Sequence, residues 1–180
     1  MADIYDFTPK CIHVCDSSCG KKFKFSKGLN GMMVGKIVKN KEYKNGKCNH
    51  HGKFETYIVN VANFNAGDEK IIGKNEIVIR DDWYQITFDY PLNNPLTKRF
   101  ESKNGFTLVD VINNIIDTYK QIYFEEEQTT KISEVKQKFC LNRGTTNGKY
   151  GIRGHDITDL VIERLGYEPI IHQLHMFIGS

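Results

Sequence analysis

"TLVDVINNIIDTYKQIYFEEE", residues 107–127, has the clearest helical pattern in the chain, and the fold class follows from it. Its apolar residues recur every three or four positions, as one face of an α-helix requires: Val109, Ile112, Ile115, Ile116, Tyr119, Ile122 and Tyr123. Thr107 is the predicted N-cap, with Asp110 as the reciprocal acid. Glu125 to Glu127 oppose the helix dipole, so we expect the helix to end or fray there.

The segments before this helix have the alternating pattern of strands. In "WYQITFDY", residues 83–90, four apolar side chains share one face: Tyr84, Ile86, Phe88 and Tyr90. Pro91 ends this strand because proline cannot donate to a ladder. Residues 97–101 are then expected to return beside it, and the segments 54–64 and 70–80 also read as strands. A hairpin followed by a long helix resembles the opening unit of a β-grasp fold.

The C-terminal region predicts a short capped helix and a closing strand. Residues 156–169 combine an N-terminal acid pair, Asp156 and Asp159, with Gly166 as C-cap and Pro169 as terminator. The segment "PIIHQLHMFI" that follows could close the sheet. Strands first and helices later predict an α+β fold. We expect an antiparallel sheet packed by one long amphipathic helix and a short C-terminal helix.

Composition divides the 180 residues into a lysine-, glycine- and cysteine-rich segment, 1–53, and a core domain, 54–180. The N-terminal segment looks irregular, and between residues 10 and 53 it holds eleven lysines but only two acids. Aromatic residues interleave with the lysines, as in proteins that bind single-stranded nucleic acid; the alternative is a solubilising surface. Neither a bilayer-spanning apolar run nor a secretory signal is visible, so an intracellular chain without membrane contact is expected.

The cysteines of the N-terminal segment suggest structural zinc. An odd total of five cysteines argues against a disulfide framework. Thiolate and imidazole are the ligands that tetrahedral zinc prefers, and the candidates are Cys15, Cys19, Cys48 and His50, with Cys11 and His51 as alternatives. Zinc would explain how a segment with so few apolar residues stays folded. The alternative is a set of reduced cysteines that pack as small hydrophobic side chains.

The glycine-rich loop, residues 144–156, is the second candidate site. Glycines at 144, 148, 151 and 154 permit a close approach of the backbone, and basic residues flank them. Because the loop leads into the predicted helix, it could hold a phosphate or a nucleic-acid backbone. The candidate ligand-binding residues are Arg143, Lys149, Gly151, Arg153 and His155. The spacing matches neither the P-loop nor the dinucleotide fingerprint, so a purely structural loop is the alternative.

The motif "GKYGIRGHDITDL", residues 148–160, is similar to a GKYGIxGHDxxDL motif in an uncharacterised family of large DNA viruses of the mimivirus type. The resemblance covers about residues 86–165 and excludes the cysteine-bearing segment. In that family tryptophan is common where Arg153 stands here. The resemblance implies no activity and no catalytic residue. It implies a viral factor or virion component, located in the host cytoplasm or the virion.

Two functions remain open on this evidence. The first is a non-enzymatic binding or scaffold protein that recognises a protein or nucleic acid. The second is an enzyme acting on a phosphorylated or nucleotide substrate at the loop 144–156. An enzyme gathers titratable groups in a pocket. The acids Asp89, Glu125 to Glu127, Asp156 and Asp159, however, are each accounted for as turn, surface or capping residues. We therefore favour binding.

The zinc hypothesis predicts that metal analysis of the purified protein finds about one zinc per chain. A chelator should then destabilise the N-terminal segment, which limited proteolysis would reveal as faster cleavage between residues 1 and 53. A metal-free protein of equal stability would contradict the hypothesis.

Overall fold

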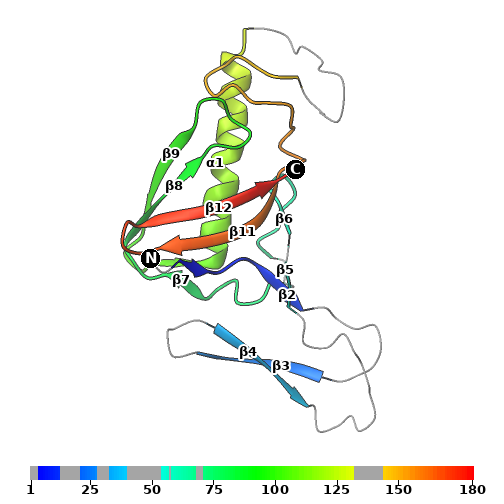
Figure 1. Cartoon of the computed structure of the whole chain (residues 1–180), viewed down its shortest axis with the longest axis vertical. Helices are drawn as coiled ribbons and strands as arrows, with labels where there is room; N and C mark the ends of the chain where they lie inside the picture. The colour runs from blue at the N-terminus through cyan, green and yellow to red at the C-terminus, as the bar shows by residue number, and fades with distance from the viewer. Residues whose placement is uncertain are drawn as a thin grey trace.

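The computed structural model describes residues 4–12, 21–27, 33–39, 54–56, 58–67, 71–131 and 144–180. In these residues one helix, α1 (Leu108–Thr129), accompanies a series of mostly short strands (Figure 1). The strands are β1 (Tyr5–Asp6), β2 (Lys10–Ile12), β3 (Lys21–Lys27), β4 (Met33–Lys39), β5 (Phe54–Thr56), β6 (Val59–Asn60), β7 (Ile77–Ile79), β8 (Trp83–Phe88), β9 (Leu96–Glu101), β10 (Phe106–Thr107), β11 (Val161–Glu168) and β12 (Gln173–Gly179). The α+β class is confirmed.

The main sheet has six strands in the order β1-β11-β12-β8-β9, with β6 also pairing with β11. Its pairs are antiparallel, as predicted, except that β12 runs parallel to β8. A parallel neighbour requires a long crossover, which β9, α1 and β11 supply here. The hairpin-then-helix unit suggested by the sequence is present as β8, β9 and α1, and a second hairpin, β11 and β12, follows it with β12 parallel to β8. This order of elements resembles that of a β-grasp fold. Such a likeness in fold carries no function with it.

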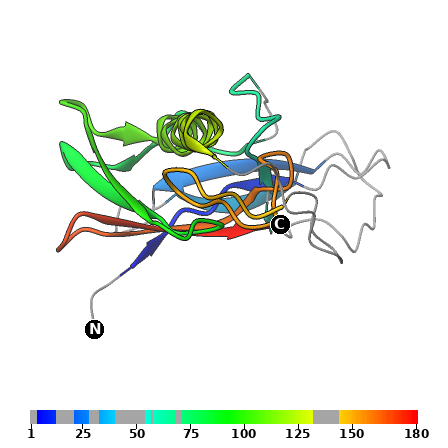
Figure 2. The ribbon, with the colours of Figure 1, turned by 90° about the horizontal axis from the view of Figure 1, so that it is seen from above.

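The helix lies on one side of the main sheet, as Figure 2 shows. The predicted capping box is present: Asp110 N donates to Thr107 Oγ1 at 3.2 Å, and Thr107 N donates to Asp110 Oδ2 at 2.9 Å. The buried stripe includes Val111, whereas Val109 is only half-buried. The predicted fraying at Glu125 is wrong, because α1 continues to Thr129. Within the described part of the chain, no helix has the length and hydropathy needed to cross a bilayer.

The predicted alternation of β8 is confirmed in the core. Tyr84, Ile86 and Phe88 are fully buried under α1, while the residues between them are half-buried on the opposite face. The aromatic rings of this layer pack edge to face, with 5.1 Å between the centroids of Phe88 and Tyr119. The buried Tyr119 hydroxyl donates to Tyr90 O at 2.8 Å. The Tyr119 hydroxyl is therefore hydrogen-bonded within the apolar core.

The predicted short helix over 156–169 is wrong. Residues 157–159 form a turn, and the rest of the segment is the strand β11 with the turn that follows it. The pairing of β11 with β12 shifts register between Ile162 and Arg164, so the buried residues Ile162 and Leu165 lie three apart. Because of this bulge, the buried residues of the strand have a spacing in the sequence that resembles the spacing of a helix.

Gly166 does not cap a helix either, but faces β1 across the sheet. It pairs with Asp6, and a Cβ atom built on it would lie 2.9 Å from Ile4 Cγ2. A side chain at position 166 would therefore require the exposed side chain of Ile4, which precedes β1, to move.

The N-terminal segment contributes directly to the main sheet through β1. Beyond β1, the chain continues the contact: Phe7 N donates to Leu165 O and Leu165 N donates to Thr8 Oγ1, both at 3.1 Å. The segment also contains regular strands, since β3 pairs with β4 and β2 with β5. The expectation of an irregular segment is wrong at these strands, where lysines alternate with apolar residues in the pattern of a strand. The domain boundary at residue 53 stays a prediction.

Candidate functional site

The glycine loop encloses an anion, and that anion is the side chain of Glu126. This residue lies in the last turn of α1, four positions after Ile122 in the buried stripe, and its side chain is 0% exposed. Its Oε1 accepts from Thr146 Oγ1 at 2.5 Å and from Gly148 N at 2.7 Å. Its Oε2 accepts from Tyr150 N at 2.7 Å and Gly151 N at 3.1 Å. We call these four donors and the carboxylate the Glu126 cradle.

The cradle keeps a buried carboxylate in its ionised form. Burial by itself raises the pKa of Glu126, because it disfavours charge. The hydrogen bonds from the Thr146 hydroxyl and from the loop N–H groups outweigh burial and hold the pKa below its ordinary value. Successive backbone N–H groups that converge in this way form an anion-binding concavity. They also offset the dipole at the C-terminal end of α1, which disfavours a negative charge.

Two glycines make the cradle sterically feasible. A Cβ atom on Gly148 would lie 2.7 Å from the carboxylate of Glu126, too close for any side chain. Gly151 has a φ of 64°, in the left-handed region that glycine adopts without strain. A side chain there would also press on Asn93 at 3.0 Å. The glycines whose spacing suggested a phosphate site therefore allow the loop backbone to approach the carboxylate of Glu126.

A second acid, Glu125, holds the outer side of the same loop. Its Oε2 accepts from Lys149 Nζ and from the Tyr150 hydroxyl, each at 2.7 Å. The Lys149 ammonium, followed by the Tyr150 hydroxyl and the Gln121 amide, lowers the pKa of Glu125 to about 2. The pair lies at the surface, with the Lys149 side chain 55% exposed, so its contribution to stability is small. The buried carboxylate, and not this ion pair, is the stronger attachment.

The opposite side of the loop is attached to the turn between β8 and β9. Asn93 N and Asn94 N both donate to Tyr150 O, at 3.1 and 2.9 Å. Arg153 N donates to Pro91 O at 2.9 Å, and Leu92 forms a bridge with Ile152. The loop, orange in Figure 1, therefore joins the end of the helix to the end of the β8–β9 hairpin.

The structure brings only part of the predicted anion set together. Lys149 and Gly151 belong to the loop around the cradle, where Glu125 and Glu126 accept their hydrogen bonds. The Arg153 side chain is exposed, and His155 is half-buried with its ring centroid 5.6 Å from that of Tyr90. Arg143 lies outside the described residues, as do the zinc candidates Cys15, Cys19, Cys48 and His50. Binding of an external anion by this set stays a prediction.

Sequence reasoning missed Glu126, the residue that organises the site. In the sequence it stands between Glu125 and Glu127, in what resembles a run of surface acids at a helix end. The available signal was its position: Glu126 continues the buried stripe through Tyr119 and Ile122. An acid in an apolar stripe needs a partner inside the protein. Over the described ranges, no group of three or more His, Cys, Asp or Glu side chains is placed to hold a metal ion.

Replacing Glu126 with Gln should lower the free energy of unfolding by about 3 kcal/mol, measured by urea denaturation. The amide has nearly the shape of the carboxylate, but its NH₂ group must face N–H or O–H donors, whichever way it turns. The matched control is Glu125→Gln, which removes an acid of the same helix turn at the surface. This control should cost about 1 kcal/mol or less. Equal losses in the two variants would contradict the role given to the buried carboxylate.

Comparison with protein-family models, with curated proteins and with solved structures finds no match to this chain. The function is therefore inferred from the geometry of the loop and of the sheet.

Proposed function

We propose that this chain is a non-enzymatic binding or scaffold protein that recognises a protein partner through the sheet face turned away from α1, here called the open face. The observation that carries the proposal is the exposure of large side chains on this face, above all Phe177, which is 59% exposed. Phe177 lies on β12 directly opposite Arg164 of β11. An exposed aromatic side chain beside arginine is typical of the centre of protein interfaces.

A second cluster on the open face is rigidly built around Trp83. The Arg99 guanidinium carbon lies 4.1 Å from the Trp83 ring centroid, and the His172 ring stacks on the indole at 4.2 Å. Arg99 belongs to β9, and His172 lies in the turn just before β12, so the indole is contacted from both strands that flank β8 or their ends. The Tyr167 hydroxyl donates to Asp81 Oδ2 at 2.5 Å and lies 3.2 Å from His172 Nδ1. A pre-ordered cluster loses little entropy on binding, which favours recognition.

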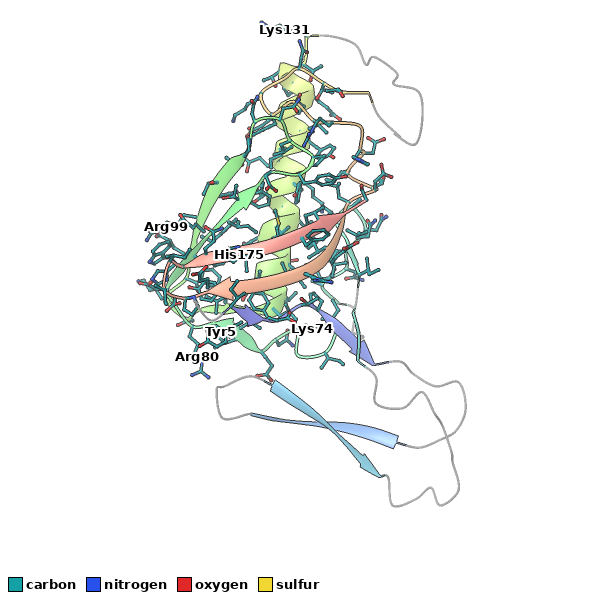
Figure 3. The ribbon with its side chains drawn as sticks, viewed as in Figure 1. Tyr5, Lys74, Arg80, Arg99, Lys131 and His175 are labelled. Atoms are coloured by element: carbon teal, nitrogen blue, oxygen red, sulfur yellow. The ribbon has the colours of Figure 1, made fainter. Side chains whose placement is uncertain are left out.

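The charges on the open face favour protein over nucleic acid. Arg99 pairs with Glu101 at 3.0 Å, and His175 Nε2 lies 3.3 Å from Glu168 Oε2. Arg99 and His175 come from β9 and β12 and are labelled in Figure 3. A nucleic-acid backbone needs unpaired positive charge along its path. Arg99 and His175 each have an acid beside them, which weakens their attraction for phosphate and favours a protein partner.

The alternative, an enzyme acting on a phosphorylated substrate at residues 144–156, receives less support. Gly148 N, Tyr150 N and Gly151 N already donate to Glu126. A phosphate placed beside them would meet the negative charge of that carboxylate. The roles of viral factor or virion component belong to the same proposal and rest on the family resemblance. Structural zinc on Cys15, Cys19, Cys48 and His50 is proposed from the sequence.

Photo-crosslinking tests the open face, because the chain offers a matched pair of exposed phenylalanines. Phe177 lies on the open face, and Phe124, 63% exposed, lies on the outer side of α1. We expect p-benzoylphenylalanine at position 177 to yield a discrete crosslinked protein in cells that express the chain, and position 124 to yield none. Both variants should unfold like the unmodified protein, because neither ring is buried.

Crosslinks at position 124 alone, or at neither position, would contradict the open face as the binding surface. If nuclease treatment removes the crosslinked product, the partner is a nucleic acid and not a protein.

A further inference from the structure

The edge strand β9 is the last strand of the main sheet, and among the described residues none pairs with its outer side. It is a regular edge: its pairing with β8 runs without a register shift from Trp83 opposite Glu101 to Phe88 opposite Leu96. A long, regular edge presents free N–H and C=O groups to another strand. Proteins commonly disrupt such an edge with a bulge or a proline, and β9 contains neither.

The hydrogen bonds of the hairpin determine which groups of β9 face outward. Ser102 N donates to Asp82 O at 2.7 Å, so these opposed residues form a hydrogen-bonded pair. Such pairs alternate along an antiparallel ladder. Phe100 and Lys98 therefore bond to β8. The backbone N–H and C=O groups of Thr97, Arg99 and Glu101 then point away from the sheet.

Lysine is a common protector of sheet edges, but Lys98 does not act in that way here. Its Nζ lies 3.3 Å from both Thr118 Oγ1 and Gln121 Oε1 of α1. It also lies 5.3 Å from the centroid of the Phe100 ring. The ammonium group is thus held against the helix and leaves the backbone of the edge accessible.

We propose that two copies of this chain pair antiparallel through β9, around a two-fold axis at Phe100. In this register Arg99 lies opposite the partner's Glu101, and Glu101 lies opposite the partner's Arg99. Opposite charges directly across a ladder stabilise pairing, and like charges destabilise it. The same patch on both copies forms a self-complementary, closed interface. The two sheets join into one, with both open faces on the same side.

Charge selects this register over its neighbours. An axis one residue earlier places Arg99 opposite the partner's Arg99. An axis two residues earlier places Lys98 opposite the partner's Lys98. Only the axis at Phe100 pairs each arginine with a glutamate and brings two phenylalanine rings together. Because the pairing uses the strand edge, it does not depend on the open face binding a partner.

Sedimentation equilibrium over a concentration series tests the pairing. We expect the unmodified protein to approach twice the 20.8 kDa of one chain. Arg99→Glu should raise the dissociation constant of the dimer roughly tenfold or more. In this variant an acid lies opposite an acid at both symmetry-related 99–101 pairs across the interface. Adding Glu101→Arg to that variant should restore the dimer. Folding should persist in each, since the two side chains are 54% and 71% exposed.

Thr97→Pro is a second, independent variant, since it removes an outward N–H and no hydrogen bond to β8; it too should dissociate the dimer. A monomeric unmodified protein would overturn the proposal. So would a dimer that Arg99→Glu leaves intact, or a charge swap that fails to restore it.

Discussion

The carboxylate of Glu126 sets a constraint that the C-terminal half of the molecule must meet. A charge enclosed at the end of a helix, without partners, costs several kcal/mol, so a folded chain has to bring donors to it. The loop brings a hydroxyl and three backbone N–H groups, and in doing so becomes fixed against α1. Its other side is then in place to contact the β8–β9 turn. One carboxylate therefore links a helix, a loop and a hairpin that are distant in the sequence.

Because Glu126 already accepts the hydrogen bonds of the loop, the loop is a weaker candidate for ligand binding than the sheet. A glycine-rich, basic loop resembles a phosphate site when only the sequence is considered, because both need N–H groups that converge on a negative charge. Here that charge is internal. The groups that we propose for recognition belong to the sheet: the Trp83 cluster, Phe177 and the edge of β9. The loop is hydrogen-bonded to α1 and to the β8–β9 turn, and we propose the open face as the surface that recognises a partner.

The sequence predicted those features that depend on neighbouring residues. The capping box at Thr107 and the alternation of Tyr84, Ile86 and Phe88 need only local spacing, and both are confirmed. Features that depend on distant residues were missed. The bulge in β11 arises from its pairing with β12, and its apolar spacing resembled a helix. The burial of Glu126 depends on a loop about 20 residues later, so the acid resembled its solvent-exposed neighbours.

The most direct test of the role of Glu126 is an NMR titration that follows its carboxyl carbon together with the amides of Gly148, Tyr150 and Gly151. A depressed pKa means that the cradle stabilises the fold fully above the pKa of an unfolded glutamate, about 4.3, and loses this contribution as pH falls through the folded value. We predict a pKa for Glu126 below that of an unfolded glutamate, with the three amide signals shifting over the same pH range. A pKa at or above the ordinary value, or amide signals that do not follow the carboxylate, would contradict the account.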